Sequence, residues 1–312
     1  MYPVSDPRVV ESRLLWSTDQ LRVLLGLWGD RSQACVMKVA TAAADVATQA
    51  RLRAEARVLS LLRGLPGVPS LLHFDAAAGL LVYSRPAGGL LLNEAALRLP
   101  RDVGRWAAAG LSLARILDGL HRAGVLHGDL RPDAVALDPA TGELELVDLG
   151  SAYLQGRIDV DFRHPAQLAR ALPFGAPELT GRLGRSADFR ADHYALGAVL
   201  YSLLCDRPPF TETEPLPLLH ALLTQVPPAP RTLSSDVPAC LSAVVMKLLA
   251  KAPERRYQSA KGLLVDLQHC VEVLQGRQAD DEHYAAGVTD RRSEPALPSR
   301  LRGSASRLGF AG

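Results

Sequence analysis

Two aspartates, Asp129 and Asp148, lie nineteen residues apart near the middle of the sequence, each at the end of an apolar run. The first belongs to "VLHGDLRPDAVAL" and the second to "LELVDLGSA". Carboxylates in such places raise the question of proton transfer or metal binding. An aspartate that caps the turn after a strand explains either residue alone. The order of the two aspartates and the motifs around them therefore decide whether they form a functional site or only cap turns.

A lysine and a glutamate upstream could complete a charged site. The run "VMK" puts Lys38 on an extended segment, and Glu55 lies midway along the helical stretch that follows. A buried or cleft-lining ammonium needs a carboxylate partner. A strand followed by a packed helix supplies one, so we expect Glu55 to face Lys38.

Two regions of different character must position these residues. Residues 14–83 read as short extended runs around one helix at 45–63, whose apolar positions recur every three or four residues. This pattern predicts a small, mostly antiparallel sheet with one helix. After "SRPAGG" the pattern becomes predominantly helical. Helices are expected at 103–124, 189–205, 215–225, 237–250 and 259–274.

Composition is that of an ordinary globular protein. The 312 residues are 48% hydrophobic and 22% charged, with a formal net charge of +2, so neither nucleic acid nor an anionic membrane is indicated as a partner. The four cysteines have no C-x-x-C spacing, which favours reduced thiols in a cytoplasmic protein. No apolar run reaches the roughly 20 residues of a membrane span. Beyond Gln275 the polar, Gly/Ser/Arg-rich text predicts a flexible tail or linker.

Further motifs occur downstream in a set order, and together they resemble a known protein family. They are "FGAPEL" with Glu178, "RADHYALGAVLYSLL" with Asp192, "RPPF", and "APERRYQSA" with Arg256. This ordered set resembles the protein kinase family over about residues 10–275, in particular the kinase domain that heads bacterial multi-domain sensor kinases. The resemblance implies a two-lobed α+β fold. It divides the chain into an N-lobe at 1–86, a C-lobe at 87–275 and a tail at 276–312.

The resemblance also implies roles for the charged residues. Lys38 matches the lysine that holds the α- and β-phosphates of ATP, and Glu55 the glutamate that positions it. Asp129 matches the catalytic aspartate that accepts the proton of the substrate hydroxyl. Arg131 stands where many Ser/Thr kinases have a lysine that contacts the γ-phosphate. Asp148 matches the ligand of Mg²⁺, with Mn²⁺ as a substitute metal.

Other positions match binding or structural residues of the family. The segment from Ser84 to Pro86 matches the hinge whose backbone binds adenine, and Val23 lies on the strand after the phosphate-covering loop. Glu178 and Arg256 should form an ion pair in the C-lobe. Asp192 should tie the catalytic loop to a buried helix.

The sequence departs from the family at the second metal ligand and at the phosphate-covering loop. Ala134 replaces the asparagine that ligates a second metal, and an alanine has no oxygen to offer a hard cation. Neighbouring Asp133 could replace it only through a shifted loop. The stretch "WSTDQLRV" has no glycine, so only the hydroxyls of Ser17 and Thr18 are available to phosphates, and weaker phosphate binding is expected.

A third departure concerns regulation. Gly128 replaces the arginine that in the family reads a phosphate on the activation loop. The loop from Leu154 to Gly175 contains no Ser, Thr or Tyr that could carry that phosphate. We therefore predict that loop phosphorylation does not switch the activity. Ala171 stands roughly where Ser/Thr kinases carry a threonine bridging to Asp129, which bears on substrate preference.

Three functions are compatible with the sequence. The first is a protein kinase in signal transduction, moving the ATP γ-phosphate to a protein hydroxyl, Ser/Thr favoured, with weakened activity. The second is a pseudokinase that binds nucleotide or a signalling partner, which Ala134 and the glycine-free loop favour. The third is a small-molecule phosphotransferase, suggested by "HGDL" but opposed by the "APE" segment and the missing asparagine.

Overall fold

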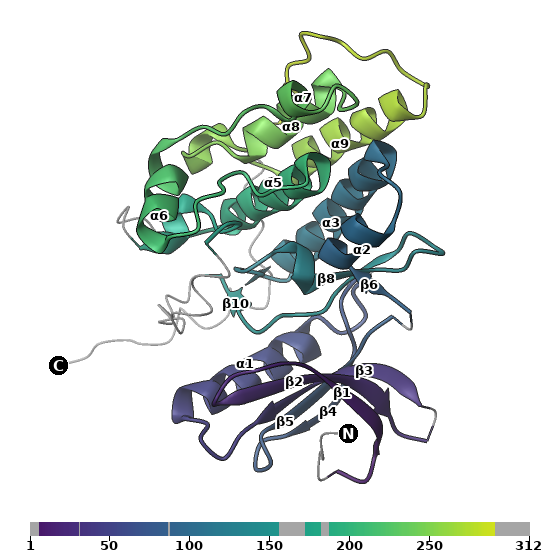
Figure 1. The fold of residues 1–312 in the computed structure, drawn as a ribbon, viewed down its shortest axis with the longest axis vertical. Coiled ribbons are helices and arrows are strands. Elements are labelled where there is room, and N and C mark those ends of the chain that lie inside the picture. Colours follow the sequence, from purple (N-terminus) through teal and green to yellow (C-terminus); the bar gives the residue numbers. More distant parts are fainter. Residues whose placement is uncertain (1–5, 31, 87, 156–171, 182–186, 291–312) are drawn as a thin grey trace, which may run out of the picture.

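A small β-rich lobe and a larger helical lobe make up the molecule (Figure 1). The computed structural model describes residues 6–30, 32–86, 88–155, 172–181 and 187–290. The two-lobed α+β architecture expected from the resemblance is confirmed.

The small lobe is built on one antiparallel sheet with the strand order β1-β2-β3-β5-β4. Its strands are β1 (Val9–Ser17), β2 (Leu21–Trp28), β3 (Gln33–Ala40), β4 (Leu71–Asp75) and β5 (Leu80–Ser84). Helix α1 (Val46–Leu61) follows β3 and contacts β3, β4 and β5. The Asp45 side chain caps this helix by accepting a 2.7 Å hydrogen bond from the Thr48 N–H.

Short strands hold the loops between the lobes (Figure 1). One small sheet joins β6 (Leu90–Leu91), β8 (Val135–Leu137) and β9 (Leu144–Leu146). A second pairs β7 (Val125–Leu126) with β10 (Tyr153–Leu154). Asp129 lies between β7 and the 3₁₀ turn Pro132–Ala134, and Asp148 follows β9. The two aspartates therefore belong to loops anchored at both ends.

Helices α3 (Val103–Arg122), α5 (Phe189–Cys205), α8 (Ala239–Leu248) and α9 (Ala260–Leu274) pack together as the core of the large lobe (Figure 1). Shorter elements complete it: α2 (Leu92–Arg98), α6 (Pro215–Thr224), α7 (Pro230–Leu233), and the 3₁₀ turns Pro177–Thr180 and Pro253–Arg255. The longer helices agree closely with the ranges expected from periodicity. Sequence reasoning did not name α2 and α7, because segments of seven and four residues carry too little periodic signal.

Residues 276–290 fold back onto the large lobe, so the expectation of a flexible tail from residue 276 is wrong for these fifteen residues. The Tyr284 hydroxyl and the Gly287 N–H donate to Asp266 at 3.0 and 2.6 Å. Asp290 accepts from the Ser259 hydroxyl at 2.7 Å and the Gln258 N–H at 2.6 Å. Hydrogen bonds thus hold this segment, and Tyr284 and Ala286 also pack against the hydrophobic core. Residues 291–312 lie outside the described ranges.

Cys35, Cys205, Cys240 and Cys270 are free thiols, and all except Cys205 are buried. Within the described ranges, no helix combines the length and the apolar character needed to cross a membrane.

Two helical glycines provide a test of how closely the helices pack. A β-carbon on Gly197 of α5 would lie 2.6 Å from the Leu248 β-carbon on α8. We expect Gly197→Ala to lower the free energy of unfolding by about 1–3 kcal/mol through overpacking. The matched control is Gly119→Ala in α3, where the nearest atom, on Leu65, would be 3.8 Å away. It should be neutral or stabilising by up to about 1 kcal/mol. Urea unfolding compares them; equal stability of both variants would contradict the close α5–α8 contact.

Candidate active site between the two lobes

A lysine from the sheet joins carboxylates from both lobes. Lys38 lies on β3, between Val23 on β2 and Leu81 on β5. Its Nζ donates to Glu55 Oε1 and Oε2 on α1 at 2.6 and 2.8 Å, and to Asp148 Oδ1 at 2.8 Å. Lys38 and Glu55 are only 5% and 3% exposed. The contact expected between them is therefore present, and it extends to Asp148.

Arg131 connects the second half of the cluster. Its Nη1 donates to Asp129 Oδ2 at 2.6 Å and its Nη2 to Asp148 Oδ2 at 2.8 Å. Its Nε lies 2.7 Å from Asp133 Oδ1. The arginine thus contacts three aspartates, Asp129 and Asp133 on its own loop and Asp148 on the loop after β9. Sequence reasoning selected Arg131 as a phosphate contact but missed this bridging, because the nineteen-residue separation of the two aspartates says nothing about their distance in space.

The charges of the cluster stabilise one another. Burial alone would lower the pKa of Lys38, but Asp148 and Glu55 hold it well above its usual range. Burial would likewise raise the pKa of Asp148, but Lys38 and Arg131 hold it well below the usual value of a carboxyl. The site therefore keeps a cationic lysine beside an ionised aspartate.

Tyr83 packs beside Lys38. It is buried, its hydroxyl donates to the Val147 carbonyl at 2.8 Å, and its ring centroid is 5.8 Å from the lysine Nζ. The Leu149 N–H donates to Glu55 Oε1 at 3.3 Å. These contacts join β5 and α1 to the loop that carries Asp148. Sequence reasoning did not select Tyr83, because a tyrosine within an apolar strand is typical of a core residue.

The hinge segment offers carbonyl oxygens rather than N–H groups. The Ser84 N–H donates to Ser70 and the Arg85 N–H to Ala34, at 2.9 and 3.1 Å. Pro86 has no N–H. Residue 87 is outside the described ranges. An adenine contact from residues 84–86 would therefore use the carbonyl side of the backbone.

The glycine-free turn between β1 and β2 uses its own hydroxyl. Thr18 Oγ1 accepts from the Gln20 and Leu21 N–H groups at 3.2 and 3.0 Å. The hydroxyl is therefore engaged in closing the turn. Its expected contribution to phosphate binding would require those hydrogen bonds to rearrange.

Asp192 on α5 holds the loop that precedes Asp129. Its carboxylate accepts from the His127 and Gly128 N–H groups, both at 2.9 Å, and lies 2.8 Å from His121 Nε2. Gly128 has a positive φ of 73°, and a β-carbon there would lie 2.9 Å from the Ser151 carbonyl oxygen. The expected tie to a buried helix is present. Any larger residue at 128 would also strain this loop.

Glu178 and Arg256 form the expected ion pair in the large lobe. Arg256 Nη1 and Nη2 donate to the two Glu178 oxygens at 2.6 and 2.8 Å. The same guanidinium donates to the carbonyls of Ala250, Arg190 and Lys251 at 2.8, 2.8 and 3.0 Å. All five N–H donors of this buried arginine are thus used. The pair fixes the segment that follows the activation loop.

The donor set fits one divalent cation. Mg²⁺ is typically bound by one or two carboxylates, substrate phosphates and water, and Asp148 could supply the carboxylate. The family's second position does not fit, since Ala134 has only a buried methyl group there. Asp133 could replace it only by leaving Arg131, whose Nε lies 2.7 Å from the Asp133 Oδ1. No cluster of three or more His, Cys, Asp or Glu suited to a metal occurs in the parts of the chain that the structure describes.

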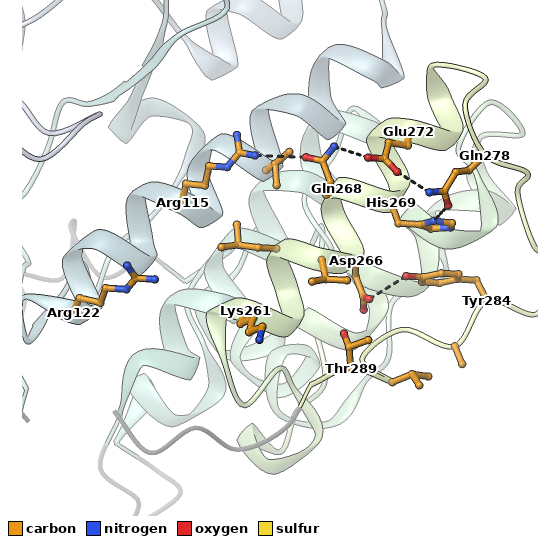
Figure 2. Close-up of a pocket in the computed structure, with 15 residues that line it drawn as sticks. Arg115, Arg122, Lys261, Asp266, Gln268, His269, Glu272, Gln278, Tyr284 and Thr289 are labelled. Carbon is orange, nitrogen blue, oxygen red and sulfur yellow. Dashed lines mark hydrogen bonds between the residues drawn. The ribbon is translucent and has the colours of Figure 1, made fainter. Parts of the chain in front are cut away.

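A hollow of about 850 Å³ lies elsewhere, on the large lobe (Figure 2). Its walls are α3, α9 and the folded-back segment before residue 290. Asp266 and Glu272 in this hollow are hydrogen-bonded to Tyr284 and Gln278 (Figure 2). Its acidic groups are therefore used in holding that segment.

Part of the activation loop, residues 156–171, lies outside the described ranges. The expectations for Ala171 and for a loop without phosphorylatable side chains fall there.

Residues 23–266 match the family described as "Protein kinase domain". The match covers both lobes and the whole charged cluster. The chain belongs to the protein kinase family.

Several bacterial serine/threonine-protein kinases are similar to this chain. A probable serine/threonine-protein kinase from Streptomyces coelicolor is 31% identical over 162 residues, 52% of this chain and 24% of that protein. The DNA damage-responsive kinase RqkA of Deinococcus radiodurans is 33% identical over 223 residues, 69% and 32% of the two chains. The kinase Pkn1 of Myxococcus xanthus is 33% identical over 223 residues, 67% and 30% of the two chains. The matched region is thus less than a third of each relative.

Loss of the Arg256 side chain tests the structural ion pair. We expect Arg256→Met to lower the free energy of unfolding by about 3–5 kcal/mol, because Glu178 would be left buried without its partner. The matched control is Arg122→Met, whose side chain is 78% exposed and pairs with Asp118. That change should cost less than about 1 kcal/mol. Chemical denaturation measures both, and a similar small loss for each would contradict a structural role of the buried pair.

The pH dependence of stability tests Glu145 on β9. Burial raises the pKa of this carboxyl to about 7, although Arg85 acts to lower it. A raised carboxyl pKa favours the folded protein while the group is protonated, and this stability is lost as pH rises from about 4.5 through about 7. Glu145→Gln should therefore raise the Tm relative to wild type more at about pH 8 than at about pH 5.

Thermal unfolding at the two pH values measures this difference. The matched control is Glu143→Gln, which removes an exposed carboxylate two residues earlier. A Tm difference between Glu145→Gln and wild type that does not change with pH would contradict the assignment.

Proposed function

We propose that this protein is a protein kinase that transfers the γ-phosphoryl group of Mg·ATP to a serine or threonine hydroxyl of a protein substrate. The observation that carries the proposal is the assembly of Lys38, Glu55, Asp129 and Asp148 into one cluster joined by hydrogen bonds of 2.6–2.8 Å. The printed names of the bacterial relatives support the choice of serine and threonine.

Each residue of the cluster has a part in the transfer. Lys38, held by Glu55, binds the α- and β-phosphates, and Val23 and the carbonyls of residues 84–86 line the nucleotide site. Asp148 holds the metal ion that, when bound, offsets the charge of the β- and γ-phosphates. Asp129 accepts the proton of the substrate hydroxyl, and Arg131 fixes its carboxylate.

The chemical step follows from these positions. The hydroxyl oxygen of the substrate forms a bond to the γ-phosphorus, and the bond from that phosphorus to the bridging β,γ-oxygen breaks. ADP leaves, and the hydroxyl proton passes to Asp129. The closed turn at Thr18 and the alanine at 134 support a turnover below that of a complete kinase, since each lost contact of about 1.4 kcal/mol is tenfold in rate.

We also propose a signalling role in the cytoplasm. Buried free thiols suit a reducing compartment. The absence of an arginine before Asp129 supports control by a means other than a loop phosphate.

Transfer of radiolabelled γ-phosphate from ATP to the protein itself and to a generic protein substrate tests the proposal. Asp129→Asn is expected to lower turnover at least about 10²-fold by removing the proton acceptor. It should keep the rise in Tm that Mg·ATP produces, whereas Lys38→Met should lose that rise. Asp118→Asn on α3 is the matched control and should behave as wild type.

Two results would contradict the proposal. Transfer that persists unchanged in Asp129→Asn would exclude Asp129 as the proton acceptor. A Tm rise with Mg·ATP but no transfer under any condition would instead favour a nucleotide-binding pseudokinase.

A further inference from the structure

Arg131 occupies the centre of the acidic site. Its side chain is only 6% exposed, and its three nitrogens lie 2.6–2.8 Å from oxygens of Asp129, Asp133 and Asp148. A planar guanidinium carries five N–H donors on three nitrogens in a fixed fork, so it can contact three carboxylates from three separate atoms. The arginine therefore supplies a fixed positive charge between the two loops.

The second metal position of the family lacks its ligand at the same place. Ala134 is fully buried, and its side chain has no oxygen to offer a cation. The one carboxylate next to it, on Asp133, is turned to Arg131. A cation at this position would lie beside the guanidinium without a facing carboxylate, whereas at the first position Asp148 and the phosphates offset the repulsion from Arg131 and Lys38.

The charge of the cluster points in the same direction. Two cationic side chains, Lys38 and Arg131, face four carboxylates, on Glu55, Asp129, Asp133 and Asp148. The net charge of these side chains is −2 when all are ionised. Arg131 supplies one of the two positive charges at the centre of the acidic loops, next to Ala134, so part of the negative charge there is already compensated before a cation binds.

We propose that the Arg131 guanidinium takes the place of the second metal ion of a protein kinase, so that this chain binds one divalent cation with its nucleotide rather than two. The inference rests on the proposed function, since it concerns the same nucleotide site. Two observations support the inference. The metal-ligating side chain is missing at Ala134, and the Arg131 guanidinium lies between the aspartates at the same place. Arg131 acts here as a positioning residue for Asp129 and Asp148.

Counting bound Mn²⁺ tests the inference directly. The full chain is saturated with a non-hydrolysable ATP analogue, and bound Mn²⁺ is counted by electron paramagnetic resonance. We expect one nucleotide-dependent Mn²⁺ per chain in the wild type and in Ala134→Asn, where the guanidinium still repels a second ion. We expect two in the double variant Arg131→Leu/Ala134→Asn.

Two Mn²⁺ ions in the wild type would overturn the inference. A count of one in the folded double variant would also overturn it, because the arginine would then not be what excludes the second ion. Circular dichroism verifies folding, and if the double variant is unfolded, Arg131→Lys/Ala134→Asn replaces it, with two ions expected because a lysine has one charged nitrogen in place of the three that contact Asp129, Asp133 and Asp148. Arg190→Lys, which alters an aspartate-paired arginine on α5, is the matched control and should keep one ion.

The dependence of transfer on free Mg²⁺ gives a second readout. At saturating Mg·ATP, excess free Mg²⁺ should leave the wild-type rate unchanged, and a second Mg²⁺-dependent phase should appear only in the double variant. A second phase in the wild type would overturn the inference.

The two proposals fail in different ways. Transfer with two bound ions would overturn only the inference and leave the kinase function standing. One bound ion without transfer would overturn only the kinase function. If Mn²⁺ does not bind with the nucleotide analogue, both proposals fail.

Discussion

The requirement that buried charges be compensated is the constraint on which this structure depends. Lys38 is almost fully buried, and an uncompensated ammonium there would be strongly destabilising. Its carboxylate partners come from helix α1 and from the loop after β9, so one side chain fixes β3, α1 and that loop relative to one another. Arg131 extends the same compensation to Asp129 and Asp133. The ionic network therefore both joins the lobes and defines the site between them.

Two further carboxylates extend this principle into the large lobe. Asp192 accepts from two consecutive backbone N–H groups of the catalytic loop, and Glu178 pairs with an arginine whose remaining donors bind backbone carbonyls. Asp192, on helix α5, positions its loop by hydrogen bonds to the backbone. Glu178, on a 3₁₀ turn, is positioned through its pairing with the charged Arg256. Asp129 thus lies on a loop whose backbone is held by Asp192 of α5, and its carboxylate accepts a hydrogen bond from Arg131. Such preorganisation matters because transfer of a phosphoryl group depends mainly on positioning and electrostatics.

The departures from the family pattern share one physical theme. The turn at Thr18 uses its own hydroxyl, the hinge presents a proline without an N–H, and position 134 has a methyl group in place of an amide. Each removes a polar contact that the family pattern has around its nucleotide. The charged centre of the cleft remains complete, with Lys38 and Arg131 bound to carboxylates on every side. Compared with the family pattern, the site therefore has fewer polar contacts at its edge, whereas the charged residues at its centre are all present.

The sequence by itself determined the two-lobed fold, the main helices and the pairing of Lys38 with Glu55, because apolar periodicity and the order of motifs along the chain carry that information. Only the tertiary structure decided that Arg131 bridges two aspartates nineteen residues apart, and that residues 276–290 fold back onto α9 rather than form a tail. The contacts to Asp148 and to Asp266 join residues 17 to 21 positions apart, and such hydrogen bonds leave no periodic pattern. Asp129 and Asp133 are each two residues from Arg131, and their contacts with it depend on the conformation of the loop.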